Sequence, residues 1–157
     1  MHDQLKSLLN NPKFTEDEFW RRIKVARGID VMRQGEHGNN LYLIESGGLR
    51  VLGHVDVNET RQMHPGVCDL HAGDVVGELV LFDSGVRSAT VQAVEDSVLI
   101  EINGDKLMSF LEHNTDIGFQ LLRSLMTVMV GRIRKNNEKI FSLLAWGLKA
   151  HQIEKDL

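Results

Sequence analysis

The sequence has 157 residues, with 42% hydrophobic residues, 25% charged residues and a formal net charge of -4. This length is typical of one folded domain, and the composition excludes a disordered or fibrous chain. The negative charge gives no general attraction to nucleic acid, and the single cysteine, Cys68, excludes an internal disulfide. The sequence contains neither a signal peptide nor an apolar run long enough to span a membrane. We therefore expect a cytoplasmic globular protein.

Residues 1–20 are predicted to form an N-terminal helical segment. Leu5, Leu8 and Leu9 have a helical spacing, and Thr15 and Glu18 have the spacing of a capping box. From residue 21 to residue 113, short runs of Val, Ile and Leu lie between turn residues at roughly the 8 to 12 residue interval of all-β folds. This pattern predicts a mainly β fold with flanking helices, in which a double-stranded β-helix (jelly roll) forms a barrel. Two hairpins are predicted inside it, 41–44 with 49–52 and 89–94 with 98–102.

Residues 114–157 are predicted to form a long C-terminal helix that serves as a lid and as a dimerisation surface. Its residues repeat with alternating spacings of four and three, the heptad seam of a two-stranded coiled coil. The seam consists of Leu122, Met126, Met129, Ile133, Asn136, Ile140 and Leu143. Asn136 favours a parallel homodimer, because across a two-fold axis an amide can bond to its own copy. The alternative is that these residues belong to the core of a single chain.

The segment from Gly77 to Ser88 contains the residue types of an anion site. Gly77 precedes an apolar stretch, 78–82, that is predicted to form one helical turn, and backbone N–H groups at a helix start stabilise anions. Arg87 has a fork of donors that suits a phosphate, and Ser88 adds a hydroxyl. Glu78 can accept hydrogen bonds from a sugar hydroxyl. The segment therefore suits a phosphate joined to a sugar, but a simple salt bridge between Glu78 and Arg87 is the alternative.

The full string is more specific than its separate residues. Gly77-Glu78-Leu79-Val80-Leu81-Phe82, followed by Arg87-Ser88-Ala89-Thr90-Val91, closely resembles the phosphate-binding cassette of the cyclic nucleotide-binding domain family. Other segments resemble the family's first hairpin, its approach to the cassette and the C-terminal helix of bacterial catabolite-activator-like proteins. They are 35–36, 41–47, 72–74 and 132–138. The resemblance covers roughly residues 15–140.

The resemblance implies a ligand and roles for particular residues. Arg87 is expected to neutralise the cyclic phosphate, and Glu78 to accept a hydrogen bond from the ribose 2′-hydroxyl. The phosphate cradle is expected at Gly77, Glu78, Leu79, Val80 and Ser88, largely through backbone N–H groups. Arg132, Asn136 and Asn137 of the long helix are expected to reach the base. The ligand is cAMP or cGMP, and the bacterial likeness favours cAMP, although Ser88 is compatible with either base.

The sequence departs from the usual family pattern at several positions. Val76, Val80 and Val86 stand where the family commonly has Phe, Ala and Pro. The tail after the long helix is also too short for the DNA-binding domain that activators of this family append. We therefore expect neither DNA binding by that route nor membrane attachment.

The leading hypothesis is a regulatory module without catalytic residues, bound metal or cofactor, in which nucleotide binding moves helices and thereby signals to a dimer partner or an effector protein. One alternative is a degenerate module that keeps the fold only for protein–protein contact. A less favoured one is a cupin-like metal enzyme, for which the candidate ligands are His37, His54, His64 and His71. These histidines lack the close pairing of a metal site.

Overall fold

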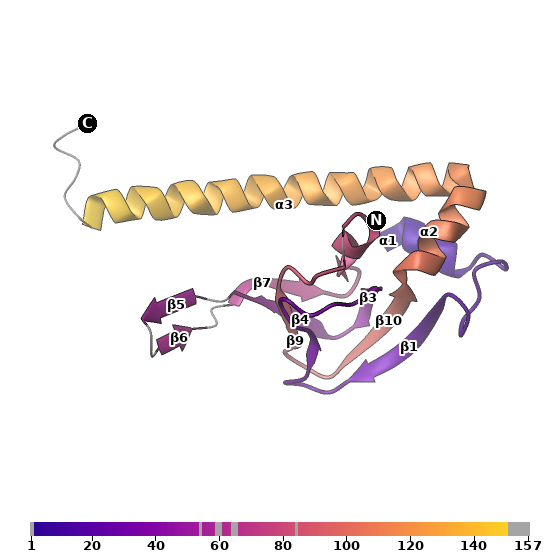
Figure 1. The fold of residues 1–157 in the computed structure, drawn as a ribbon, viewed down its shortest axis with the longest axis horizontal. Helices are drawn as coiled ribbons and strands as arrows, with labels where there is room; N and C mark the ends of the chain where they lie inside the picture. The colour runs from indigo at the N-terminus through magenta and orange to yellow at the C-terminus, as the bar shows by residue number, and fades with distance from the viewer. Residues whose placement is uncertain (1, 54, 59–60, 64–65, 84, 151–157) are drawn as a thin grey trace. The chain divides into compact units, whose positions relative to one another are not determined.

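A computed structural model of the chain describes residues 2–53, 55–58, 61–63, 66–83 and 85–150 (Figure 1). The chain divides into two compact units, of which one spans residues 2–115 and the other contains residues 116–157. The first unit holds the strands and two helices, and the second is the long helix. Within the described ranges no helix combines the length and the apolar character needed to cross a membrane.

The strands form two four-stranded sheets and one two-stranded sheet, in which every pair of named strands is antiparallel. The first sheet has the order β1 (Trp20–Val25), β10 (Ser97–Asn103), β3 (Asn40–Ser46) and β8 (Val75–Val76). The second has the order β2 (Asp30–Met32), β9 (Thr90–Ala93), β4 (Gly48–Leu52) and β7 (Gly66–His71). The small sheet contains β5 (Val55–Asn58) and β6 (Arg61–Met63). The predicted mainly β class is confirmed, although the sheets are not closed into a barrel.

The two predicted hairpins are wrong. β3 pairs with β8 and β10, whereas β4 pairs with β7 and β9; β9 and β10 likewise lie in different sheets. The chain changes sheet between β3 and β4 at Gly47, whose φ of 89° and whose contact with Ser97 leave no room for a side chain. Alternating apolar residues identify strands but not their partners, so the sequence pattern could not separate a tight hairpin from a change of sheet.

The main hydrophobic core lies between the two large sheets. Its buried members come from both of them: Met32, Tyr42, Ile44, Leu49, Leu70, Val76, Val91, Ala93 and Leu99. Because successive side chains of a strand point to opposite faces, Leu41 and Leu43 of β3 point away from this core, yet both are buried as well. β3 is therefore covered on both faces, which holds its first residues, next to the candidate site, in a fixed position.

The N-terminal segment begins with α1 (His2–Leu9), as predicted, but the predicted capping box does not start a helix. The Thr15 hydroxyl donates a hydrogen bond of 3.0 Å to Glu18 within a turn, where Asp17 has a left-handed φ of 66°. The turn instead brings Phe14 and Phe19 together, with ring centres 4.7 Å apart, and both rings lie against Phe110 of α2 (Gly104–His113). This aromatic cluster fastens the N-terminal segment to α2.

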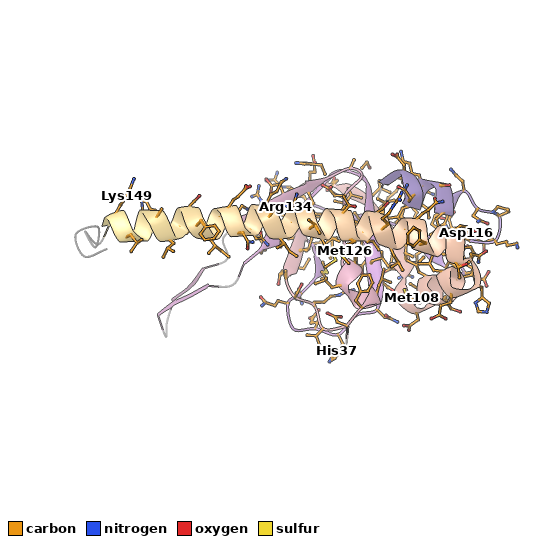
Figure 2. All side chains as sticks on the ribbon, turned by 90° about the horizontal axis from the view of Figure 1, so that it is seen from above. His37, Met108, Asp116, Met126, Arg134 and Lys149 are labelled. Carbon is orange, nitrogen blue, oxygen red and sulfur yellow. The ribbon has the colours of Figure 1, made fainter. Side chains whose placement is uncertain are left out.

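The long helix α3 (Thr115–Ala150) occurs where a long C-terminal helix was predicted, and α2 precedes it along the chain. Asn103 caps α2, since its side chain accepts a hydrogen bond of 3.0 Å from the backbone N–H of Lys106. Figure 2 labels Met126, Arg134 and Lys149 along α3 and shows side chains projecting on all sides of the helix. The lid and dimerisation roles of this helix remain predictions.

Acid is expected to weaken the link between β1 and β3. Arg22 binds the Glu45 carboxylate through two hydrogen bonds, of 2.7 and 2.9 Å, and these lower the pKa of Glu45 below its ordinary 4.5. A carboxyl group whose pKa is lowered in the folded state stabilises the fold at pH values above its unfolded-state pKa. This stabilisation is lost as the pH falls through its folded-state pKa. Since both side chains are partly exposed, Glu45→Gln is expected to cost about 0.2–1 kcal/mol at pH 7.

Urea unfolding of both proteins at pH 7 and pH 3 measures this contribution. The difference between the wild-type protein and Glu45→Gln is expected to be smaller at pH 3 than at pH 7, because protonation of the wild-type carboxyl group removes the charge that the amide also lacks. An equal difference at both pH values would show that the ion pair does not stabilise the fold.

Candidate functional site

The site is built at the end of β8, where the chain turns through Gly77 into the short 3-10 helix η1 (Glu78–Leu81). Gly77 is the N-cap of η1, with the left-handed angles φ 79° and ψ 9°. A Cβ at this position would lie 2.8 Å from Nη1 of Arg87. The sequence therefore needs glycine here for both its conformation and its closeness to the arginine.

Arg87 is a buried cation, with 7% of its surface exposed. Its Nη2 atom donates a hydrogen bond of 2.7 Å to the backbone carbonyl of Asn40, and its guanidinium carbon lies 6.0 Å from the centre of the Tyr42 ring. Burial of a charge is costly unless an opposite charge or hydrogen bonds compensate it, so a bound anion would stabilise this buried guanidinium.

The other cassette residues take different environments. Glu78 is buried at the first position of η1, with 4% exposure, and its neighbours Leu79 and Val80 are half-buried. Ser88 is exposed beside Arg87. The alternative of a simple salt bridge between Glu78 and Arg87 stays a prediction. The segment supplies a buried carboxylate and a buried guanidinium.

The three valines that depart from the family pattern fit the structure. Val76 is buried in the core, and Val86 is partly exposed, with an isolated antiparallel bridge to His37, which is labelled in Figure 2. The methyl groups of Val80 lie beside Gly85 and Gly104; Cγ1 is 3.4 Å from where a Cβ of Gly104 would stand. The larger side chain of Val80 therefore has room against the start of α2.

The segment 35–40 forms one side of the site, which the sequence did not predict. Its backbone is hydrogen-bonded to that of Arg87, because Gly35 N–H donates to the Arg87 carbonyl and Arg87 N–H donates to the Glu36 carbonyl, both at 2.9 Å. Gly38 lies so close to the guanidinium that a Cβ would stand 2.7 Å from Nη2. A carbonyl oxygen and a glycine carry no side-chain signal; only the short spacing between Gly35 and Gly38 hinted at a close backbone approach.

The predicted base-contacting residues lie on α3, in the second unit. Arg132 is half-buried, and Asn136 and Asn137 are exposed. Their positions along the helix differ by four residues and by one, so Arg132 and Asn136 share a helix face while Asn137 is turned away from it by about 100°. Their predicted role in base recognition stays a prediction.

The metal-site alternative receives no structural support. In the parts of the chain that the structure describes, no three His, Cys, Asp or Glu side chains are grouped so that they could hold a metal ion. His54 and His64, two of the four candidate ligands, lie outside the described residues. His37 and His71 lie on the loop next to Gly38 and at the end of β7, respectively.

The first unit thus combines two large antiparallel sheets with a buried arginine beside a glycine turn. Comparison with known proteins specifies the class, because residues 22–114 match the family described as "Cyclic nucleotide-binding domain". The chain belongs to the cyclic nucleotide-binding domain family. The resemblance inferred from the cassette is thereby confirmed.

Individual relatives cover different shares of the chain. A CRP-like cAMP-activated global transcriptional regulator of Mycobacterium tuberculosis is 29% identical over 78% of this chain and 51% of its own length. A cAMP-dependent protein kinase regulatory subunit of Blastocladiella emersonii is 42% identical over 48% of this chain and 18% of its own. The chain therefore spans about half, or less, of these curated relatives.

Among solved structures, a cyclic nucleotide-binding domain from Methylobacillus flagellatus KT has the same fold. It superposes with a TM-score of 0.69 at 22% identity and covers 79% of this chain and 67% of its own. At this identity the likeness establishes the fold and not the ligand. The mainly β arrangement with a long C-terminal helix is thus shared with a member of the family.

Proposed function

We propose that this chain binds a cyclic nucleotide and acts as a regulatory module, without catalysis of its own. The observation that carries the proposal is the buried guanidinium of Arg87, which lies beside Gly77 and is anchored on the Asn40 carbonyl. An anion at this place would compensate the buried charge. The family to which the chain belongs makes a cyclic phosphate the anion that we expect.

Each cassette residue then has a role in the proposal. Arg87 binds the phosphate, and Glu78, at the first position of η1, accepts a hydrogen bond from the ribose 2′-hydroxyl. Gly77 brings the backbone close to the ligand, while Leu79, Val80 and Ser88 complete the cradle. We further propose that Arg132, Asn136 and Asn137 recognise the base and that cAMP is preferred to cGMP. The cAMP-activated regulator and the cAMP-dependent kinase subunit named above support that preference.

Calorimetric titration of the purified chain with cAMP and with cGMP tests the proposal. We expect saturable binding with a lower Kd for cAMP, and no comparable binding of 5′-AMP, whose phosphate carries more charge and is not closed onto the ribose. Binding of neither cyclic nucleotide would refute the proposed function and leave a fold retained for protein–protein contact. A lower Kd for cGMP would refute only the nucleotide preference.

A path for regulation is supported by the contacts of the loop 35–40. The Asn40 carbonyl accepts from Arg87, while the neighbouring Asn39 carbonyl accepts a hydrogen bond of 2.7 Å from Gly104, the first residue of α2. The Asn39 side chain also donates to the Asp105 carboxylate. A phosphate bound by Arg87 would therefore be connected through this loop to α2, and α2 is followed along the chain by α3. In our proposal binding shifts these helices, and the movement reaches a dimer partner or an effector protein.

We also propose that α3 forms a parallel homodimer through the heptad seam. Ile133, Ile140 and Leu143 of the seam are between 56% and 67% exposed, which is unusual for large aliphatic side chains at regular helical spacing. A second copy of the helix would cover them, and Asn136 would meet Asn136 of the other copy. Such a seam supplies the apolar contact that one copy of the helix lacks.

Replacing Ile133 and Ile140 together by aspartate is expected to convert the dimer to a monomer. Burying an uncompensated charge costs about 3–5 kcal/mol, which exceeds what a short coiled coil tolerates. Sedimentation velocity at micromolar concentration measures the change. Lys135→Asp serves as the control, because it introduces an aspartate off the seam and should leave the dimer intact. A wild-type chain that sediments as a monomer at these concentrations would refute the dimer.

A further inference from the structure

The guanidinium of Arg87 is held from several sides. Gly38 and Gly77 approach it so closely that a Cβ on either would stand 2.7 or 2.8 Å from its nitrogens. Asn40 binds Nη2 at 2.7 Å, and the nitrogen nearest Gly77 is the other arm, Nη1. One arm of the fork is therefore anchored on a carbonyl, and the other faces the turn that opens η1.

Tyr42 is a further neighbour of the guanidinium and contributes an aromatic face. The ring is 7% exposed, belongs to the core between the sheets and lies 6.0 Å from the guanidinium carbon, within cation–π range. Tyr42 lies on β3, two residues after Asn40, whose carbonyl binds Arg87. Its position is therefore set by the sheet and not by the ligand.

The orientation of Tyr42 is itself fixed across three strands. Its hydroxyl donates a hydrogen bond of 3.3 Å to Glu101, the residue opposite it on β10. Glu101 forms an ion pair with Arg21, its partner on β1. Burial raises the pKa of Tyr42, so the phenol stays neutral and continues to donate. A chain of contacts thus extends from Arg87 through Tyr42 and Glu101 to Arg21. Arg21 lies on β1, the edge strand of the sheet.

We infer that Tyr42 is a positioning residue for Arg87. The ring holds the guanidinium against the Asn40 carbonyl before any anion arrives, so that Nη1 already faces the cradle at Gly77. A long arginine side chain loses considerable rotamer freedom when it binds a phosphate, and a site that has fixed the side chain on folding avoids that loss on binding. This inference rests on the proposed function for the identity of the anion, but the ordering of Arg87 concerns the unliganded chain.

The test compares Tyr42→Phe, which keeps the ring, with Tyr42→Leu, which removes it. In the unliganded chain labelled with 15N-arginine, the Nε–Hε signal of Arg87 is assigned by its absence in Arg87→Ala. We expect a dispersed, slowly exchanging signal in the wild type and in Tyr42→Phe, and an averaged or missing signal in Tyr42→Leu. The Kd for cAMP is expected to change less than about threefold in Tyr42→Phe and to rise about 3- to 30-fold in Tyr42→Leu.

Further variants separate positioning from loss of fold. Tyr42→Met fills the space with a flexible apolar chain and replaces Tyr42→Leu if the latter unfolds. Gly48→Ala is the control, because the nearest atoms to its added Cβ belong to the side chains of Glu95 and Val94, and it should change neither signal nor Kd. An unchanged Arg87 signal in a folded ring-deleted variant would overturn the inference. If the wild type binds no cyclic nucleotide, the proposed function fails, yet the arginine spectra still decide the role of Tyr42.

Discussion

Replacing Arg87 by alanine is expected to reduce the affinity for cyclic nucleotide by about 2–5 kcal/mol, roughly 30- to 4,000-fold. The guanidinium is 7% exposed and already anchored on Asn40, so it would meet the phosphate in an environment with little competing water. Removing it leaves the phosphate with backbone N–H groups but no opposite charge. Calorimetric titration of the variant with cAMP measures the loss.

Matched variants make this result specific. Arg87→Lys keeps the charge but not the fork of donors, so an intermediate affinity is expected. Arg50→Ala removes an arginine that pairs with Asp69 at 2.6 Å on the exposed surface of the second sheet, and it should leave the affinity unchanged. Thermal unfolding of all variants shows whether lost binding reflects a lost fold. An Arg87→Ala variant that is folded and binds cAMP like the wild type would place the phosphate elsewhere.

The largest effect on stability is expected from Phe14→Ala, at about 3–5 kcal/mol. Phe14 is 1% exposed and lies against both Phe19 and Phe110, with ring centres 4.7 and 5.1 Å away. Its carbonyl also accepts a hydrogen bond of 3.0 Å from the Trp20 indole, which ties the turn to the first strand. Deleting the ring leaves a cavity among these aromatic residues, and urea unfolding measures the resulting change in free energy.

Phe141→Ala is the control for this prediction, because the same ring is removed at a position that is 69% exposed. A change within about 0.5 kcal/mol is expected there, as for surface substitutions in general. Since domains of this size are stable by about 5–15 kcal/mol, the loss of Phe14 would remove a large part of the total. Equal effects of the two substitutions would mean that the aromatic cluster does not stabilise the first unit.

The linear sequence was sufficient for the features that depend on local order. The string from Gly77 to Val91 combines a glycine turn, a short apolar stretch and an arginine, and it predicted the cyclic nucleotide-binding domain family. The match of residues 22–114 to that family confirms the prediction. The long helix was likewise visible, because a helical period sustained over many residues has no strand-like alternative. Such signals need no knowledge of which distant segments meet.

Strand pairing and the surroundings of Arg87 depended on the tertiary structure. The runs 41–44 and 49–52 look like a hairpin in the sequence, but β3 and β4 lie in different sheets, because burying two apolar faces against each other outweighs local proximity along the chain. The contacts of Arg87 with Gly38, Asn40 and Tyr42 join residues more than 40 positions apart through a glycine, a carbonyl oxygen and a ring face. None of these groups has a distinctive side-chain pattern, and only folding brings them around one buried charge.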